Sequence, residues 1–115
     1  MKDWTAIRER YLRDDLPVRL GGLAANLSRI KSFANNENNK ALVESLIDES
    51  KYFIEWTAHE TEIDTAAKLV ELQVELALLH FKLDKVWLDA EQRRQISEKS
   101  NAWSQQVLMV SGLLG

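Results

Sequence analysis

The stretch TEIDTAAKLVELQVELALLHFKLDKVWL, residues 61–88, contains neither glycine nor proline and decides the fold of this chain. Its apolar residues recur every three to four positions, which predicts an amphipathic helix over residues 62–88, roughly 40 Å long at about 1.5 Å per residue. These residues cover an arc of roughly 240°, whereas a helix in a bundle usually needs little more than about 100°. We therefore expect this helix to pack on two sides.

Two apolar stripes and a polar line between them run along this predicted helix. One stripe consists of Val70, Val74 and Phe81, with Ala77 beside it. The other stripe consists of Leu72, Leu76, Leu79, Leu83 and Val86. The polar line consists of Gln73, His80 and Asp84. Because His80 and Asp84 are four residues apart on one helix, we expect them to hydrogen-bond.

The two-sided helix has two interpretations. In the first, one side packs inside the protomer and the other against a second copy, with the leucine stripe (Leu72, Leu76, Leu79, Leu83) as a candidate self-association surface. The polar line is then a satisfied network. In the second, Gln73, His80 and Asp84, with Trp87 beside them, line a pocket that binds a ligand or catalyses a reaction. We favour the structural role, because a single histidine on an apolar face is more commonly a satisfied core group.

Upstream, residues 16–34 form a predicted helix with a narrow seam at heptad spacing, made of Leu16, Leu20, Leu23, Leu27, Ile30 and Ala34. Small residues lie on one flank of this seam, among them Gly21, Ala25 and Ser28. Such a flank lets another backbone approach closely. We favour close packing inside the bundle, and we keep self-association through Gly21, Ala25 and Ser28 as the alternative.

The remaining sequence predicts three more helices. Residues 3–13 form a short N-terminal segment, and residues 39–59 form a helix with one apolar face. Residues 89–112 form a helix whose first half is mostly polar and expected to be exposed. Asp89 and Gln92 have capping-box spacing, so we place a break there, with one continuous helix over residues 62–112 as the alternative. The predicted fold is all-α: an up-down-up-down four-helix bundle with a short additional N-terminal helical segment, in one domain over residues 1–115.

Composition narrows the functional classes. The chain has 115 residues, no cysteine, one proline and four glycines. The lack of cysteine excludes disulfides and thiolate chemistry and favours a cytoplasmic location. No apolar run approaches the roughly 18 residues that would span a bilayer, so we expect no membrane partner. The start of the chain is polar and charged, so we expect no signal peptide.

Charge is unevenly distributed along the chain. Residues 1–34 hold seven Lys/Arg against four Asp/Glu, residues 35–75 hold three against ten, and the net charge is -3. The acidic middle makes nucleic acid an unlikely partner. The basic N-terminal region could bind an acidic partner, including another copy, and a weaker hypothesis is nucleic-acid binding through Arg8, Arg10, Arg13 and Arg19.

Motifs for chemistry are absent from the sequence. Neither His59 nor His80 follows a glutamate by three residues, as the Glu-x-x-His motif of di-iron bundles requires. The sequence also lacks a phosphate-binding loop and a nucleophile elbow. We therefore predict no catalytic residue, metal or cofactor. The predicted function is non-enzymatic: a homodimer that acts through protein–protein interaction. The alternative is a small-molecule-binding or catalytic bundle around Gln73, His80 and Asp84.

Overall fold

The computed structural model of the chain describes residues 2–114, and these residues contain helices and no strand. The helices are α1 (Trp4–Leu12), α2 (Leu16–Phe33), α3 (Lys40–Thr57), α4 (Ile63–Val86) and α5 (Ala90–Ser111). Two short 3-10 turns, Glu37–Asn39 and Ala58–Glu60, lie before and after α3. The predicted all-α class is confirmed. Met1 and Gly115, the ends of the predicted domain, lie outside the described residues.

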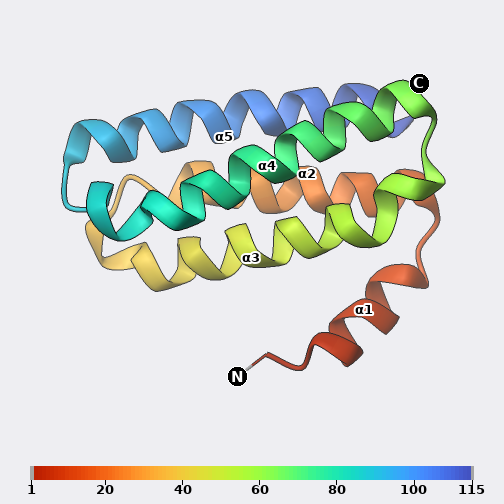
Figure 1. Cartoon of the computed structure of the whole chain (residues 1–115), viewed down its shortest axis with the longest axis horizontal. Helices are drawn as coiled ribbons and strands as arrows, with labels where there is room; N and C mark the ends of the chain where they lie inside the picture. The colour runs from red at the N-terminus through yellow and green to blue at the C-terminus, as the bar shows by residue number, and fades with distance from the viewer. Residues whose placement is uncertain (1, 115) are drawn as a thin grey trace.

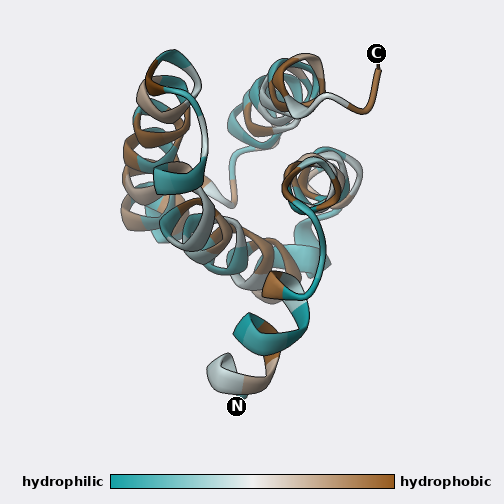
Figure 2. Cartoon of the chain, turned by 90° about the vertical axis from the view of Figure 1, so that its right-hand side faces the viewer, coloured by the Kyte–Doolittle hydropathy of each residue, from teal (hydrophilic) through white to brown (hydrophobic). Residues whose placement is uncertain are grey.

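The four long helices lie side by side, and α1 projects from one end of α2 toward α3 (Figure 1). α2 packs on α5 and on α3, and α3 packs on α4. α4 and α5 make few contacts with each other, although the chain passes directly from one to the other. Seen from the end, their ribbons are separated (Figure 2), and an apolar cleft of about 430 Å³ lies between Leu69 and Leu72 of α4 and Val107 and Val110 of α5.

The core is built around the leucine seam of α2. Leu23, Leu27 and Ile30 are almost completely buried. α3 contributes buried residues of its one apolar face, among them Val43, Ile47 and Ile54. Each such side chain contributes about 1.5–3 kcal/mol to stability when it is fully removed from water.

α4 and α5 are separate helices. The side chain of Asp89 caps α5 by accepting hydrogen bonds from the backbone N–H groups of Glu91 and Gln92. Before this cap, the Nε1–H of the buried Trp87 donates a 2.7 Å hydrogen bond to the carbonyl of Glu37. The break therefore has two causes: a carboxylate that satisfies the first N–H groups of α5, and an indole that fixes the end of α4.

The expectation that the first half of α5 is exposed was only partly right. Glu91, Arg94 and Glu98 are exposed, whereas Arg93, Ser97 and Ser100 are buried. The Oγ of Ser97 donates a 2.8 Å hydrogen bond to the carbonyl of Lys31, and the Oγ of Ser104 donates one of the same length to the carbonyl of Ala24. Serine is small and can satisfy its hydroxyl on a neighbouring backbone, so a polar sequence forms a close interface with α2.

Candidate functional site

α4 turns one apolar stripe inward and the other outward. Leu72, Leu76 and Leu83 of the leucine stripe are buried inside the protomer, and Leu79 is half-buried. In contrast, Val70 is 49% exposed, Val74 55% and Phe81 80%. The choice of Leu72, Leu76, Leu79 and Leu83 as self-association residues is therefore corrected, because α4 uses this stripe to close its own core. The stripe available to a partner is the opposite one.

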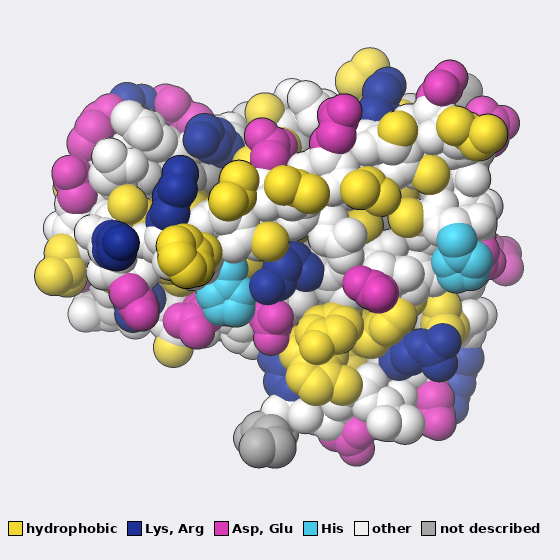
Figure 3. Space-filling model, viewed as in Figure 1, with side chains coloured by type: hydrophobic (Ala, Val, Ile, Leu, Met, Phe, Trp, Pro, Cys, Tyr) yellow, Lys and Arg dark blue, Asp and Glu magenta, His cyan; other side chains and the backbone are white. Residues whose placement is uncertain are grey.

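The exposed stripe is longer than the sequence pattern alone suggested. Seven exposed apolar residues form it, six in α4 and the last in the turn that follows: Ile63, Ala67, Val70, Val74, Ala77, Phe81 and Leu88. We call these seven residues the outer seam. They are spaced by alternating intervals of four and three positions, with one interruption at Asp84. In the space-filling view, hydrophobic side chains run along α4 on the face that Figure 3 shows. An average spacing of about 3.5 residues is that of a helix seam that packs against another helix.

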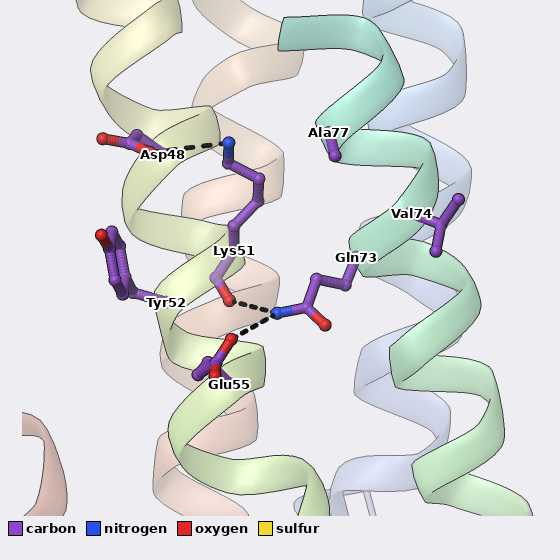
Figure 4. Close-up of a pocket in the computed structure, with 7 residues that line it drawn as sticks. All are labelled: Asp48, Lys51, Tyr52, Glu55, Gln73, Val74 and Ala77. Atoms are coloured by element: carbon purple, nitrogen blue, oxygen red, sulfur yellow. Dashed lines mark hydrogen bonds and ion pairs between the residues drawn. The ribbon is translucent and has the colours of Figure 1, made fainter.

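The polar line lies on the side of α4 that faces α3. The Nε2 of Gln73 donates hydrogen bonds to the carbonyl of Lys51 (3.1 Å) and to Oε2 of Glu55 (3.2 Å), as Figure 4 shows. The ammonium of Lys51 lies 3.0 Å from Nδ1 of His80, and Nε2 of His80 lies 3.5 Å from Oε1 of Glu44. Because an ammonium can only donate, Nδ1 is the acceptor and Nε2 carries the proton that points to Glu44.

Asp84, the last member of the polar line, also binds α3. Its Oδ1 accepts a hydrogen bond from Nζ of Lys40, and this bond lowers the pKa of Asp84 and raises the pKa of Lys40. The predicted bond between His80 and Asp84 is not formed within residues 2–114, because each side chain has a partner across the helix interface. Trp87 does not join the line, since it is buried at the end of α4 on the carbonyl of Glu37.

The polar line borders open surface grooves and not an internal pocket. One groove of about 430 Å³ lies between α3 and α4, lined by Asp48, Lys51, Tyr52, Glu55, Gln73, Val74 and Ala77 (Figure 4). A neighbouring hollow of about 350 Å³ has His80, Trp4 and Lys2 on its walls. Because Gln73, His80 and Lys51 already have hydrogen-bond partners, the polar groups here serve the contact between α3 and α4.

The basic N-terminal region is partly used inside the protomer. Arg19 is buried, and its guanidinium forms two hydrogen bonds to the carboxylate of Glu60, of 2.7 and 3.0 Å. Arg19 is therefore not available to bind nucleic acid, as the weaker hypothesis required. Trp4 docks on α3, where its ring centroid lies 4.3 Å from that of Tyr52 and 6.4 Å from that of Trp56.

The small-residue flank of α2 is in close contact with the rest of the protomer at Gly21. A Cβ added at Gly21 would lie 2.6 Å from Cδ1 of Leu113, and the carbonyl of the neighbouring Ala24 accepts the bond from Ser104. Ala25 is half-buried and Ser28 is exposed. Close packing within the chain therefore accounts for Gly21, and the sequence analysis favoured that alternative.

Residues 2–114 contain neither a metal-binding cluster nor a membrane-spanning helix. Among residues 2–114, no three His, Cys, Asp or Glu side chains are grouped so that they could hold a metal ion. In the same part of the chain, every helix is too short or too polar to cross a membrane. Comparison with protein-family models, with curated proteins and with solved structures gave no match. Function is therefore inferred from the geometry of this chain.

Proposed function

We propose that this protein is a non-enzymatic interaction module that self-associates through the outer seam of α4. In this proposal the long helices form an up-down-up-down four-helix bundle, with α1 as an additional segment. One observation carries the proposal: α4 buries Leu72, Leu76 and Leu83 in its own core and exposes a second apolar stripe at heptad spacing on the opposite side. Contiguous exposed apolar surface of this kind is typical of interaction sites.

The polar line supports an interaction role over a catalytic one. Gln73, His80 and Asp84 each bind a residue of α3, so they form a row of contacts along the helix interface. Such a row fixes the rotation of α4 about its own axis. A fixed rotation determines which stripe faces the core and which faces outward, so the polar line positions the outer seam for a partner.

Two further parts of the proposal rest on composition. The absence of cysteine supports a cytoplasmic location, because disulfides rarely form in that reducing compartment and a domain of this size can be stable without them. The partner class is protein, because the outer seam is apolar and the chain around it carries net negative charge, which disfavours nucleic acid. The proposal includes no cofactor.

Light scattering coupled to size exclusion tests this proposal. At about 100 μM, where even a weak dimer is populated, we expect a mass above the 13.2 kDa of one chain. Val70→Glu should give the monomer mass, because it places a charge in the outer seam. Val18→Glu is the matched control, since Val18 of α2 is also 49% exposed and lies outside the seam. A monomeric wild type, or equal effects of the two substitutions, would overturn the proposal.

A further inference from the structure

We infer that the partner of the outer seam is the outer seam of a second copy, with the two α4 helices antiparallel about a twofold axis. This inference rests on the proposed self-association and adds its geometry. A twofold axis makes the same surface serve both copies, as in most homodimers. α4 lies at the outer edge of the bundle (Figure 2) and in front of the other helices (Figure 1), and the seven side chains of the outer seam are exposed.

The full length of the seam defines one register. If Ile63 faces the partner's Leu88, then Val70 faces the partner's Phe81 and Val74 faces the partner's Ala77. The twofold axis then passes between positions 75 and 76. Alanine and valine lie near this axis, where they allow close approach, and the largest side chains lie farther out. The paired segment is roughly 37 Å long at about 1.5 Å per residue.

Charges beside the seam favour this register. Asp64 and Lys85 directly follow seam positions 63 and 84, on the same flank of the helix. In the full-length antiparallel pair, Asp64 lies beside the partner's Lys85, and symmetry repeats this opposite-charge pair at the other end. A shift by one heptad in one direction would instead place Glu71 beside the partner's Glu71 on the axis. A shift in the other direction would place Asp84 opposite the partner's Val74 and leave Ile63 and Ala67 without a seam residue opposite them. Flanking charges of this kind set orientation and register in paired helices.

Asp64 and Lys85 are free to make this contact. Both are exposed, and neither forms an ion pair with another residue in the range 2–114. They are separated by roughly 31 Å along one helix, so they cannot pair within a chain. The charged seam position, Asp84, would face the partner's Ala67, whose small side chain leaves the carboxylate and its partner Lys40 in contact with water.

A charge-reversal cycle tests the orientation and register. Asp64→Lys or Lys85→Asp alone places like charges together at both ends, and we expect each to raise the dimer Kd about tenfold at low salt. The double variant restores opposite charges, so its Kd should return to within about threefold of the wild type, although each substitution also opposes the helix dipole. Additive effects of the two substitutions would overturn the inferred register.

Disulfide trapping gives an independent measurement, because the chain has no cysteine of its own. We expect a mixture of Val70→Cys and Phe81→Cys chains, under mild oxidation, to yield the mixed dimer, since these positions face each other. Each variant alone should remain largely uncrosslinked, because position 70 lies about 16 Å along the axis from position 70 of its partner. Met109→Cys is the control, because Met109 is exposed on α5, away from the seam. Mixed with Val70→Cys or with Phe81→Cys in place of the other variant, it should not yield the mixed dimer.

The two proposals fail in different ways. If Val70→Glu abolishes the oligomer but each cysteine variant crosslinks mainly with itself, the seam functions in a parallel pair and only the present inference is wrong. If Val70→Cys links to Val74→Cys and not to Phe81→Cys, the helices pair in the register that places Glu71 beside the partner's Glu71. The inferred register is then wrong. If the wild type is monomeric, the proposed function itself fails. Circular dichroism of every variant verifies that it has folded.

Discussion

The hydroxyl of Tyr11 donates a 2.7 Å hydrogen bond to the backbone carbonyl of Arg19, and this bond is buried. The same hydroxyl lies 3.4 Å from Oγ1 of Thr57, which donates to it. The ring of Tyr11 stacks on Phe53 with centroids 3.9 Å apart. One side chain of α1 therefore connects α1, α2 and α3. Burial raises the pKa of Tyr11 to about 12.

The raised pKa of Tyr11 predicts a loss of stability at alkaline pH. The ordinary value is 10.0, so between pH 10 and 12 the unfolded chain releases this proton while the folded chain retains it. The free energy of unfolding should fall with pH in this range, by roughly 2–3 kcal/mol at its upper end. Tyr11→Phe should remove this dependence and cost about 1 kcal/mol at neutral pH through the lost hydrogen bond.

Urea unfolding between neutral pH and pH 11.5 measures this effect. Tyr52→Phe is the control, because Tyr52 is 39% exposed and its replacement leaves the Tyr11 hydroxyl in place. This control should keep the alkaline decrease of the wild type. If Tyr11→Phe loses stability as steeply as the wild type, the buried phenol is not the cause.

The ion pair of Arg19 and Glu60 predicts a second pH dependence, at the acid end. The hydrogen bonds from Arg19 lower the pKa of Glu60 from its ordinary value of 4.5. The stabilisation is therefore present above pH 4.5 and is lost as pH falls through the lowered value in the folded state. We expect Glu60→Gln to lower stability at neutral pH, where it leaves the buried Arg19 without a charged partner, and to weaken the acid dependence.

Urea unfolding from pH 7 to pH 3 compares this variant with Glu9→Gln, which changes an exposed glutamate of α1. The control should follow the wild type across the range. Equal acid dependence in the wild type and in Glu60→Gln would show that another carboxylate dominates.

The all-helical fold could be predicted because local signals were strong. Residues 61–88 lack any helix breaker, and the apolar period is that of a helix. The interface between α2 and α5 was harder to predict, because serines such as Ser97 and Ser104 are polar and do not add to an apolar seam. Their hydroxyls are satisfied on carbonyls of α2, and a sequence does not show which backbone groups lie opposite.

The candidate site was only half predictable, for a related reason. The sequence showed that α4 has two apolar stripes, but either stripe could have faced the core. The deciding contacts join distant residues: Gln73 with Lys51 and Glu55, and Asp84 with Lys40. These contacts fix the rotation of the helix, so the valines and Phe81 face outward. The heptad spacing from Ile63 to Leu88 was visible in the sequence and would have shown the full length of the seam.

Two glycines should respond in opposite directions to alanine. A Cβ at Gly22 would lie 3.7 Å from Cε1 of Tyr11, an ordinary contact, inside α2. Gly22→Ala should therefore raise the free energy of unfolding by about 0.5–1 kcal/mol. Gly112 ends α5 with φ of 86°, so Gly112→Ala should lower stability by about 1–2 kcal/mol. Thermal unfolding measures both, and shifts of the same sign would contradict this account.

Two buried serines of α5 separate the contribution of one hydrogen bond from the effect of burial. Ser104 donates to the carbonyl of Ala24, whereas the Oγ of Ser100 is fully buried and has no partner among the described residues. Ser104→Ala should cost about 1 kcal/mol. Ser100→Ala should be neutral or stabilising, because it removes a desolvated hydroxyl and alanine is the better helix former.

Both substitutions delete one oxygen from the same helix, so the change in helix propensity is similar in the two variants and largely cancels in their difference. That difference, measured by urea unfolding, reports the bond from α5 to α2. The variant Ser100→Val is the counterpart test of packing: its added methyl groups should destabilise the protein by about 1–3 kcal/mol where α2 and α5 are in close contact. If Ser100→Val is tolerated as well as Ser100→Ala, the interface is less closely packed than the buried serines indicate. Equal losses in Ser104→Ala and Ser100→Ala would instead show that the bond to Ala24 contributes nothing.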